Sequence, residues 1–247
     1  MLATYSFFQI SSGRAGWGYL LIQNALPAVD TFFFMSGLLV SYLSLIQMER
    51  GKFNLVLYYV HRIIRLIIPL GLAIAFTIAT IPYMSYGPVY DSMAKGQSQI
   101  CKDNGWRTLL FINNFYPGVE MCLGQTWYLA NDMQFYILAP LLIYPLKKMP
   151  KVGFALSGAI YVGLTILMGF LTVHYELGPE SFLTLHTTPD SWNEQDFYYF
   201  KPYARFQPYL IGILMGYALY KTKDKDIKIP HVCPIRFQKG LNAKLLN

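Results

Sequence analysis

The chain has 247 residues, of which 54% are hydrophobic and 13% are charged, whereas soluble proteins average about 25% charged residues. Aromatic residues make up 17% of the chain, a usage that suits membrane–water boundaries. The net charge of +7 does not indicate a nucleic-acid-binding protein, because the basic residues stand at the ends of apolar runs and form no single polar face. These values predict an integral membrane protein.

The first residues do not resemble a cleavable signal peptide. The segment MLATYSFFQI has no basic region and no small-residue cleavage site before the first long apolar run. Met1 is therefore a candidate internal methionine of a longer protein.

Five apolar stretches are candidate membrane helices, because about 20 residues at a rise of 1.5 Å cross a hydrocarbon core of roughly 30 Å. They lie near residues 29–46, 63–82, 127–146, 152–173 and 206–220. The last is short, so we expect Arg205 and Lys221 to extend it by snorkelling. We predict an all-α fold, a polytopic transmembrane helix bundle, with a membrane domain over residues 1–220 and a basic tail over residues 221–247.

The basic residues divide the connections into two sets. The connections 47–62 and 147–151 and the tail 221–247 hold 13 Lys and Arg in 48 positions, whereas 83–126 and 174–205 hold 5 in 76. The positive-inside rule assigns the first set to the cytoplasm. We therefore expect a multi-pass protein of the plasma membrane or an endomembrane, with its C-terminal tail cytoplasmic.

The cysteines are distributed in agreement with this topology. Cys101 and Cys122 both lie in the first outer loop, where a disulfide is chemically permitted. Two unpaired thiols are the alternative. Cys233 lies in the predicted cytoplasmic tail and should stay reduced.

Two arginines stand where the second apolar run begins. Arg62 and Arg65 are spaced i, i+3 and share one side of a helix, so their guanidinium groups could bind phosphate oxygens. Alternatively, they anchor the cytoplasmic end of the helix, as the positive-inside rule requires. Arg65 lies one turn inside the run, where an unpaired charge costs about 2.5–3.5 kcal/mol, so it needs a partner or a watery cavity.

Acidic residues pose the same problem on the opposite side of the predicted bundle. Asp132 lies about 8 Å past the outer start of the third helix, so Asp132 and Arg65 are expected near opposite faces, on the order of 15 Å apart, and are not expected to pair. Asp30 begins the first helix and Arg205 the fifth, both on the outer side with Asp132. The hypothesis is that Arg205 neutralises either Asp132 or Asp30.

Other polar residues have weaker claims to a function. His61 adjoins the arginine pair and could act as a base near neutral pH, or could simply face lipid headgroups. Amide side chains near the outer loop could bridge helices or contact a substrate; they are Asn113, Asn114, Gln125, Asn131 and Gln134. The sequence contains no metal-ligand cluster, nucleophile elbow or Gly-rich phosphate loop, and no bound cofactor is expected.

Four segments together resemble a known family. They are VDTFFFMSGLLVSY (29–42), HRIIRLIIP (61–69), GQTWYLANDMQFYILAPLL (124–142) and RFQPYLIGILMGYAL (205–219). In this order they resemble the acyltransferase type 3 family, and more closely its animal branch, the nose-resistant-to-fluoxetine proteins. The outer-loop cysteines and the CLGQTWYLANDMQ wording are similar to the animal branch in particular.

The resemblance implies a multi-pass protein of about ten helices that transfers acyl groups, often from acyl-CoA, to sugars, lipids or other hydroxyl acceptors. Arg62 and Arg65 match the family's R-x-x-R pair, which implies that they bind the phosphates of acyl-CoA as co-substrate. Asp132 falls where bacterial members carry Glu, which implies a catalytic role on the outer side. Membrane lipid and a hydroxyl acceptor are the other implied partners.

Two departures from the family pattern bear on activity. The family's general base is a histidine in a helix before the FF-x-x-SG helix, and no His precedes His61 in this chain. Five helices are also about half the expected set, so the chain is either part of a longer product or a degenerate copy without the base. The expected function is acyl transfer; the alternative is a non-enzymatic membrane protein that binds or moves lipids or hydrophobic compounds.

Overall fold

The structure is a computed structural model that describes residues 25–174 and 199–223. Its helices are α3 (Ala25–Glu49), α4 (Leu55–Ala79), α5 (Pro88–Leu109), α6 (Trp127–Lys148), α7 (Pro150–His174) and α9 (Pro202–Thr222). Short 3-10 helices cover Ile81–Tyr83, Asn113–Phe115, Gly118–Glu120 and Gly124–Thr126, and the described residues contain no strand. The predicted basic tail from residue 224 onward, with Cys233, lies outside the described residues.

Each of the five predicted apolar helices is present, and the largest difference is at the start of the second. That helix was expected from residue 63, but α4 begins at Leu55. The side chain of Asn54 accepts hydrogen bonds from the backbone N–H groups of Val56 and Leu57 at 3.0 and 3.3 Å, which satisfies donors that the first turn leaves unpaired. With this cap, α4 begins about two turns before the expected start at residue 63.

Three helices are long and apolar enough to cross a membrane by length and composition: Ala28–Glu49, Leu55–Tyr83 and Pro150–His174. Two other predicted spans, α6 and α9, do not meet that standard among the described residues. They occupy the interior of the bundle, where α6 buries eleven residues and α9 buries eight. The buried polar side chains Asn131, Asp132 and Arg205 therefore face protein. The protein is an all-α membrane protein.

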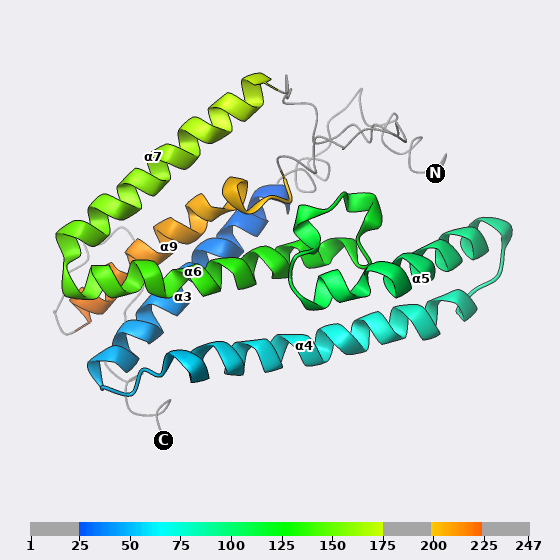
Figure 1. The fold of residues 1–247 in the computed structure, drawn as a ribbon, viewed down its shortest axis with the longest axis horizontal. Coiled ribbons are helices and arrows are strands. Elements are labelled where there is room, and N and C mark those ends of the chain that lie inside the picture. The colour runs from blue at the N-terminus through cyan, green and yellow to red at the C-terminus, as the bar shows by residue number, and fades with distance from the viewer. Residues whose placement is uncertain (1–24, 175–198, 224–247) are drawn as a thin grey trace, which may run out of the picture.

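Helices α3 and α9 form the tightest pair and run side by side in the same direction (Figure 1). Their contact depends on glycines. A Cβ atom on Gly216 would lie 2.5 Å from the carbonyl oxygen of Leu38, and one on Gly212 would lie 3.0 Å from the backbone nitrogen of the same residue. Gly37 of α3 is equally close to α9, because a Cβ atom on it would clash with the backbone carbonyl of Tyr209. This is the G-x-x-x-G mode of packing, in which missing side chains let two membrane helices approach closely.

Helix α6 joins the other helices into one core, packing against α3, α7 and α9. Phe135 of α6 contacts Phe33 of α3 and Tyr209 of α9, with ring centroids 5.4 and 5.2 Å apart. A single residue, Met149, separates α6 from α7, and the turn is close because Gly153 packs on the backbone of Leu146.

Helix α5 was not predicted, because its polar sequence lies within the expected outer loop 83–126. It packs antiparallel to the second half of α4, and in Figure 1 the two form a hairpin that extends beyond the other helices. The α5 side of the contact consists of small buried residues at helical spacing, Ala94, Ser98, Cys101, Gly105 and Thr108.

Candidate functional site

Three helices bring polar side chains together inside the bundle. The Ser36 hydroxyl of α3 donates a 2.6 Å hydrogen bond to Asp132 Oδ1 of α6. The Arg62 guanidinium of α4 donates to Asp132 Oδ2 and forms an ion pair with it. The Asp132 side chain is only 8% exposed and that of Arg62 is 23% exposed. Both carboxylate oxygens are therefore engaged, and the charges of this buried centre cancel.

Two tyrosines hold the arginine in place. The Arg62 guanidinium lies 4.1 Å from the ring centroid of Tyr136, a cation–π contact. The other face of that ring stacks on Tyr58, with centroids 4.1 Å apart and planes at 5°. Each tyrosine hydroxyl donates to the other's backbone carbonyl, at 3.2 and 3.1 Å. The tyrosine pair thus locks α4 to α6 one turn below the ion pair.

The expected separation of Arg65 and Asp132 along the bundle, on the order of 15 Å, is wrong, although these two residues do not pair with each other among the described residues. Tyr58 meets Tyr136 and Arg62 meets Asp132, so α4 and α6 run antiparallel with these pairs four residues apart on each helix. Arg62 lies two turns inside α4, because the helix begins at Leu55. It therefore reaches the level of Asp132.

Sequence reasoning missed the other members of this centre, although a signal was present. Ser36 is a polar residue inside an apolar run. It lies in VDTFFFMSGLLVSY (29–42), one of the four segments that resemble the family, where it is the serine of the FF-x-x-SG pattern. Tyr58 and Tyr136 stand four residues from Arg62 and Asp132, the spacing of neighbours on one helix face. Matching aromatic residues at that spacing on two helices could have indicated their register.

Arg65 does not join the centre. Its side chain is exposed, and within residues 25–174 and 199–223 its guanidinium makes no hydrogen bond or ion pair. Its neighbours Ile64 and Ile68 are apolar and are 53% and 59% exposed. The structure therefore separates the two arginines of the R-x-x-R motif, turning Arg62 toward α6 and leaving Arg65 outside. His61 is also exposed.

Of the two partners considered for Arg205, the structure gives it Asp30. The Arg205 Nη1 group donates to both Asp30 oxygens, at 2.9 and 3.0 Å. Arg205 Nε donates to the Tyr199 carbonyl at 3.2 Å, and the guanidinium lies 4.2 Å from the Tyr199 ring centroid. Burial raises the pKa of the Tyr199 phenol, which keeps the ring beneath the arginine neutral.

Charged pairs at both ends of α3 define a depth for the buried centre. Asp30 pairs with Arg205 near one end, and Glu49 pairs with Lys223 at the other. The 19 residues between them span about 28 Å, close to the roughly 30 Å of a bilayer core. Ser36 lies about 9 Å from the Asp30 level and about 20 Å from the Glu49 level, so the centre is in the half nearer Asp30.

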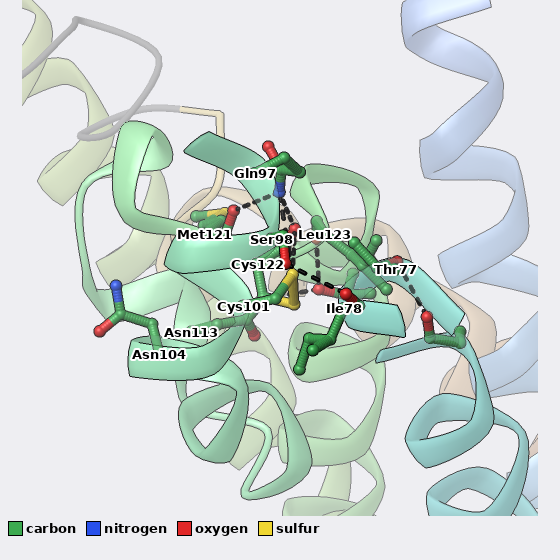
Figure 2. The surroundings of a disulfide bond; sticks show 12 residues. Thr77, Ile78, Gln97, Ser98, Cys101, Asn104, Asn113, Met121, Cys122 and Leu123 are labelled. Carbon is green, nitrogen blue, oxygen red and sulfur yellow. Dashed lines mark hydrogen bonds between the residues drawn. A yellow bond between two sulfur atoms is a disulfide. The ribbon is translucent and has the colours of Figure 1, made fainter. Parts of the chain in front are cut away.

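A disulfide fixes α5 to the segment that leads into α6. Cys101 and Cys122 are joined by an S–S bond of 2.05 Å, and both are buried. As Figure 2 shows, Gln97 points at the same corner, where its amide donates to the backbone carbonyl of Cys122. Ser98 of α5 donates to the carbonyl of Ile78 at 3.2 Å. The helix that the disulfide fixes is therefore also bonded to the end of α4.

Three of the five amide residues singled out in the sequence bond to one another: Asn114, Asn131 and Gln134. Asn113 Nδ2 instead donates to the Thr126 hydroxyl at 2.8 Å, and Gln125 is exposed. Asn114 Nδ2 donates to Asn131 Oδ1 at 2.7 Å, and Gln134 Nε2 donates to Asn114 Oδ1 at 2.9 Å. Asn131 Nδ2 donates to the Phe200 carbonyl at 2.9 Å, and Lys201 Nζ donates to the Asn114 carbonyl at 3.0 Å. Since these groups satisfy each other in a buried position, they connect the loop before α6 to the start of α9. This favours the structural use over substrate contact.

Among the described residues, no group of three or more His, Cys, Asp or Glu could hold a metal ion. The site that remains is a neutral, buried Ser–Arg–Asp centre inside an all-α membrane bundle, with one further arginine exposed beside it. This arrangement is a membrane protein with a buried polar centre in the half of α3 that is nearer the Asp30–Arg205 pair.

Comparison with known proteins gives the family. The sequence profile of the acyltransferase type 3 family, described as an acyltransferase domain, matches residues 2–237. Nose resistant to fluoxetine protein 6 of Caenorhabditis elegans is 33% identical over 232 residues, which is 85% of this chain and 28% of that protein. The chain belongs to the acyltransferase type 3 family.

Two other relatives show how widely the similarity extends. Regulator of hypoxia-inducible factor 1 of Caenorhabditis elegans is 26% identical over 82% of this chain and 42% of its own length. A candidate O-acetyltransferase of Staphylococcus aureus strain COL is 24% identical over 81% of this chain and 32% of its own length. The chain thus spans less than half the length of these relatives. No solved structure matches it significantly.

Proposed function

We propose that the full-length protein is a multi-pass membrane acyltransferase that transfers an acyl group, with acyl-CoA as donor, to a hydroxyl acceptor. The observation that carries the proposal is the buried centre itself. Ser36, Arg62 and Asp132 come from three family-like segments up to 96 residues apart in the chain, and they meet by direct hydrogen bonds. A buried ion pair in apolar helices is costly to maintain, which favours a functional role.

The chemistry assigns different tasks to these groups. In acyl transfer, the acceptor hydroxyl attacks the thioester carbonyl, negative charge develops on the carbonyl oxygen, and the thiolate leaves. Arg62 is the group suited to stabilise that charge, since a fixed cation in a water-poor site acts strongly. Asp132 accepts from both Ser36 and Arg62, so it is placed to hold Arg62 and not to remove a proton. The proton acceptor is expected from the family's membrane histidine.

The depth of the centre changes how an acyl-CoA donor would bind. If the end with Lys147, Lys148 and Lys223 is cytoplasmic, as the positive-inside rule suggests, Arg62 lies about 20 Å from it. A cytosolic donor would then deliver its acyl end, and not its distal phosphates, to Arg62. We therefore propose that the buried centre receives the reacting carbonyl, and not that both arginines bind the same phosphates.

The test is acyl transfer from labelled acetyl-CoA in membranes that contain the full-length protein. Asp132→Asn should lower the rate at least about 100-fold, the size of effect seen when one charge-stabilising group is lost. Asp103→Asn is the matched control, because Asp103 lies on the exposed face of α5 and, within the part of the chain that the structure describes, accepts only from Gln99, at 3.1 Å. Equal rates for wild type and Asp132→Asn would refute the assignment of the centre.

A second candidate is a non-enzymatic protein that binds or moves lipids or hydrophobic compounds. The observation in its favour is that, among the described residues, no histidine belongs to the buried centre: His61 is exposed on α4 and His174 stands at the end of α7. Uptake of a labelled amphiphile that is independent of acyl-CoA, together with no detectable transfer or hydrolysis, would support this function over catalysis.

A further inference from the structure

A tyrosine of α9 lies beside the buried centre, and its hydroxyl is unpaired. Tyr209 is 0% exposed, and among the described residues its hydroxyl oxygen has no hydrogen-bond partner. We propose that Tyr209 is a catalytic residue of the centre, whose hydroxyl donates a hydrogen bond to the carbonyl oxygen of the acyl group during transfer. This inference rests on the proposed acyltransferase function and adds a fourth residue, from a fourth helix, to the groups that perform it.

The packing of α9 places Tyr209 between α3 and α6. Its backbone carbonyl lies against Gly37 of α3, where a Cβ atom on the glycine would clash with it, and Gly37 directly follows the serine of the centre. Its ring packs on Phe135 of α6, with centroids 5.2 Å apart, and Phe135 stands three residues from Asp132. The Tyr209 hydroxyl is within electrostatic reach of Asp132 and Arg62. It therefore belongs to the same polar centre.

This centre has more hydrogen-bond donors than its acceptors use. Both oxygens of Asp132 are engaged, one by Ser36 and one by Arg62. Two buried donors still lack an acceptor in the described part of the chain, the Tyr209 hydroxyl and the Nε–H group of Arg62. A buried donor without an acceptor is unfavourable, so this arrangement suits an oxygen atom that a ligand brings.

A neutral carbonyl oxygen fits this position better than an anion does. The charge of Arg62 is already neutralised by Asp132, so a further full negative charge would be buried without a counter-charge, which is costly. A thioester carbonyl has no net charge and gains negative charge only as it reacts. The phenol of Tyr209 is itself neutral, and burying a neutral donor costs much less than burying a charged one.

The proposed step assigns Tyr209 a hydrogen bond and no proton transfer. The oxygen of the acceptor hydroxyl bonds to the thioester carbon, and the electron pair of the C=O double bond moves onto the carbonyl oxygen. The C=O bond then re-forms as the C–S bond breaks, and the thiolate takes up the proton that the acceptor has lost. The products are an ester and free coenzyme A. Since charge develops on the carbonyl oxygen, a fixed donor there stabilises the transition state more than the substrate.

The experiment compares Tyr209→Phe with wild type in the full-length protein, by transfer from labelled acetyl-CoA and by thermal unfolding. Phenylalanine keeps the ring that packs on Phe135 and Phe206 and removes only the hydroxyl. We expect kcat to fall about 100-fold, the effect of losing one oxyanion donor, with KM for acetyl-CoA changed less than threefold. The Tm should equal or exceed that of wild type, because the variant loses a buried hydroxyl that has no partner.

Tyr217→Phe is the matched control. Tyr217 is also buried in α9, at 6% exposure, but it lies eight residues, or about 12 Å, farther along the helix, and its ring packs on Phe154 of α7. That variant should keep kcat within twofold of wild type.

Three results would overturn the inference, and they differ in what else they affect. If Tyr209→Phe transfers acyl groups as fast as wild type, the role of Tyr209 is refuted and the proposed function stands. If its kcat and Tm fall together, the hydroxyl supports the fold and not the reaction. If wild type itself transfers no acyl group, the proposed function is refuted, and the role of Tyr209 with it.

Discussion

The contact between α3 and α9 offers a sharp test of the fold, because it depends on atoms that glycine lacks. A Cβ atom added to Gly216 would lie 2.5 Å from the Leu38 carbonyl oxygen and 2.9 Å from Ser41 Cβ. Ordinary contact begins at 3.4 Å, so Gly216→Ala requires the helices to part by about 0.9 Å. Both obstacles belong to the backbone or to a Cβ atom, and neither can rotate away.

The expected cost follows from that displacement. A gap of 0.5–1 Å loses about a quarter to a half of the dispersion energy of each contact it opens, and overpacking in cores costs about 1–3 kcal/mol. Alanine gains about 1 kcal/mol over glycine in a helix interior, which partly offsets the loss. Gly163→Ala in α7 is the matched control, because a Cβ atom there meets nothing within 4 Å and only the gain applies.

The assay is thermal unfolding of the full-length protein in one detergent, with both variants compared with wild type. Gly216→Ala should unfold at a lower temperature than wild type, and Gly163→Ala at the same temperature or a higher one. If the two variants have the same Tm, the close glycine contact between α3 and α9 does not exist as described.

Three further substitutions test the other contacts. Cys122→Ala should lower the free energy of unfolding by about 3 kcal/mol, the loop-closure value for a disulfide across 21 positions, and a reductant should then have no further effect on the Tm of the variant. Asp30→Asn should cost about 1–2 kcal/mol by chemical unfolding, less than the loss of a fully buried pair, because the Asp30 side chain is 38% exposed; an equal loss in a variant that already lacks Arg205 would contradict the ion pair between these residues. Tyr136→Phe should cost about 1 kcal/mol for one hydrogen bond and keep activity, whereas Tyr136→Leu, which also removes the ring beneath Arg62, should lower both stability and transfer rate.

The sequence predicts the parts of this fold that depend on composition. Long apolar runs identify the cores of five helices, and Cys101 and Cys122 identify the disulfide that the structure contains. Helix α5 could not be found this way, since its buried face consists of small residues and most of its exposed residues are polar or glycine, with Val89, Met93 and Trp106 as the exceptions. Such a helix has no apolar stripe, and only its contact with α4 distinguishes it from a loop.

The candidate site shows why a membrane register is harder to predict than a membrane helix. The predicted separation of about 15 Å between Arg65 and Asp132 rested on a helix that begins at residue 63. The actual start at Leu55 places Arg65 eight residues, or about 12 Å, farther inside the helix, and this accounts for most of the error. The apolar run does not reveal the start, because the first two turns of α4 are held by the Asn54 cap and by Tyr58.

Opposite charges carry the missing information about register. An Arg and an Asp that both lie inside neighbouring apolar helices are each too costly to leave unpaired, so their pairing limits how the helices can slide. Here a single alignment satisfies Arg62 with Asp132 and also stacks Tyr58 on Tyr136. Sliding α4 by one turn would break both contacts together. In this chain, therefore, the buried charges determine the register of α4 against α6 more closely than the ends of the apolar runs do.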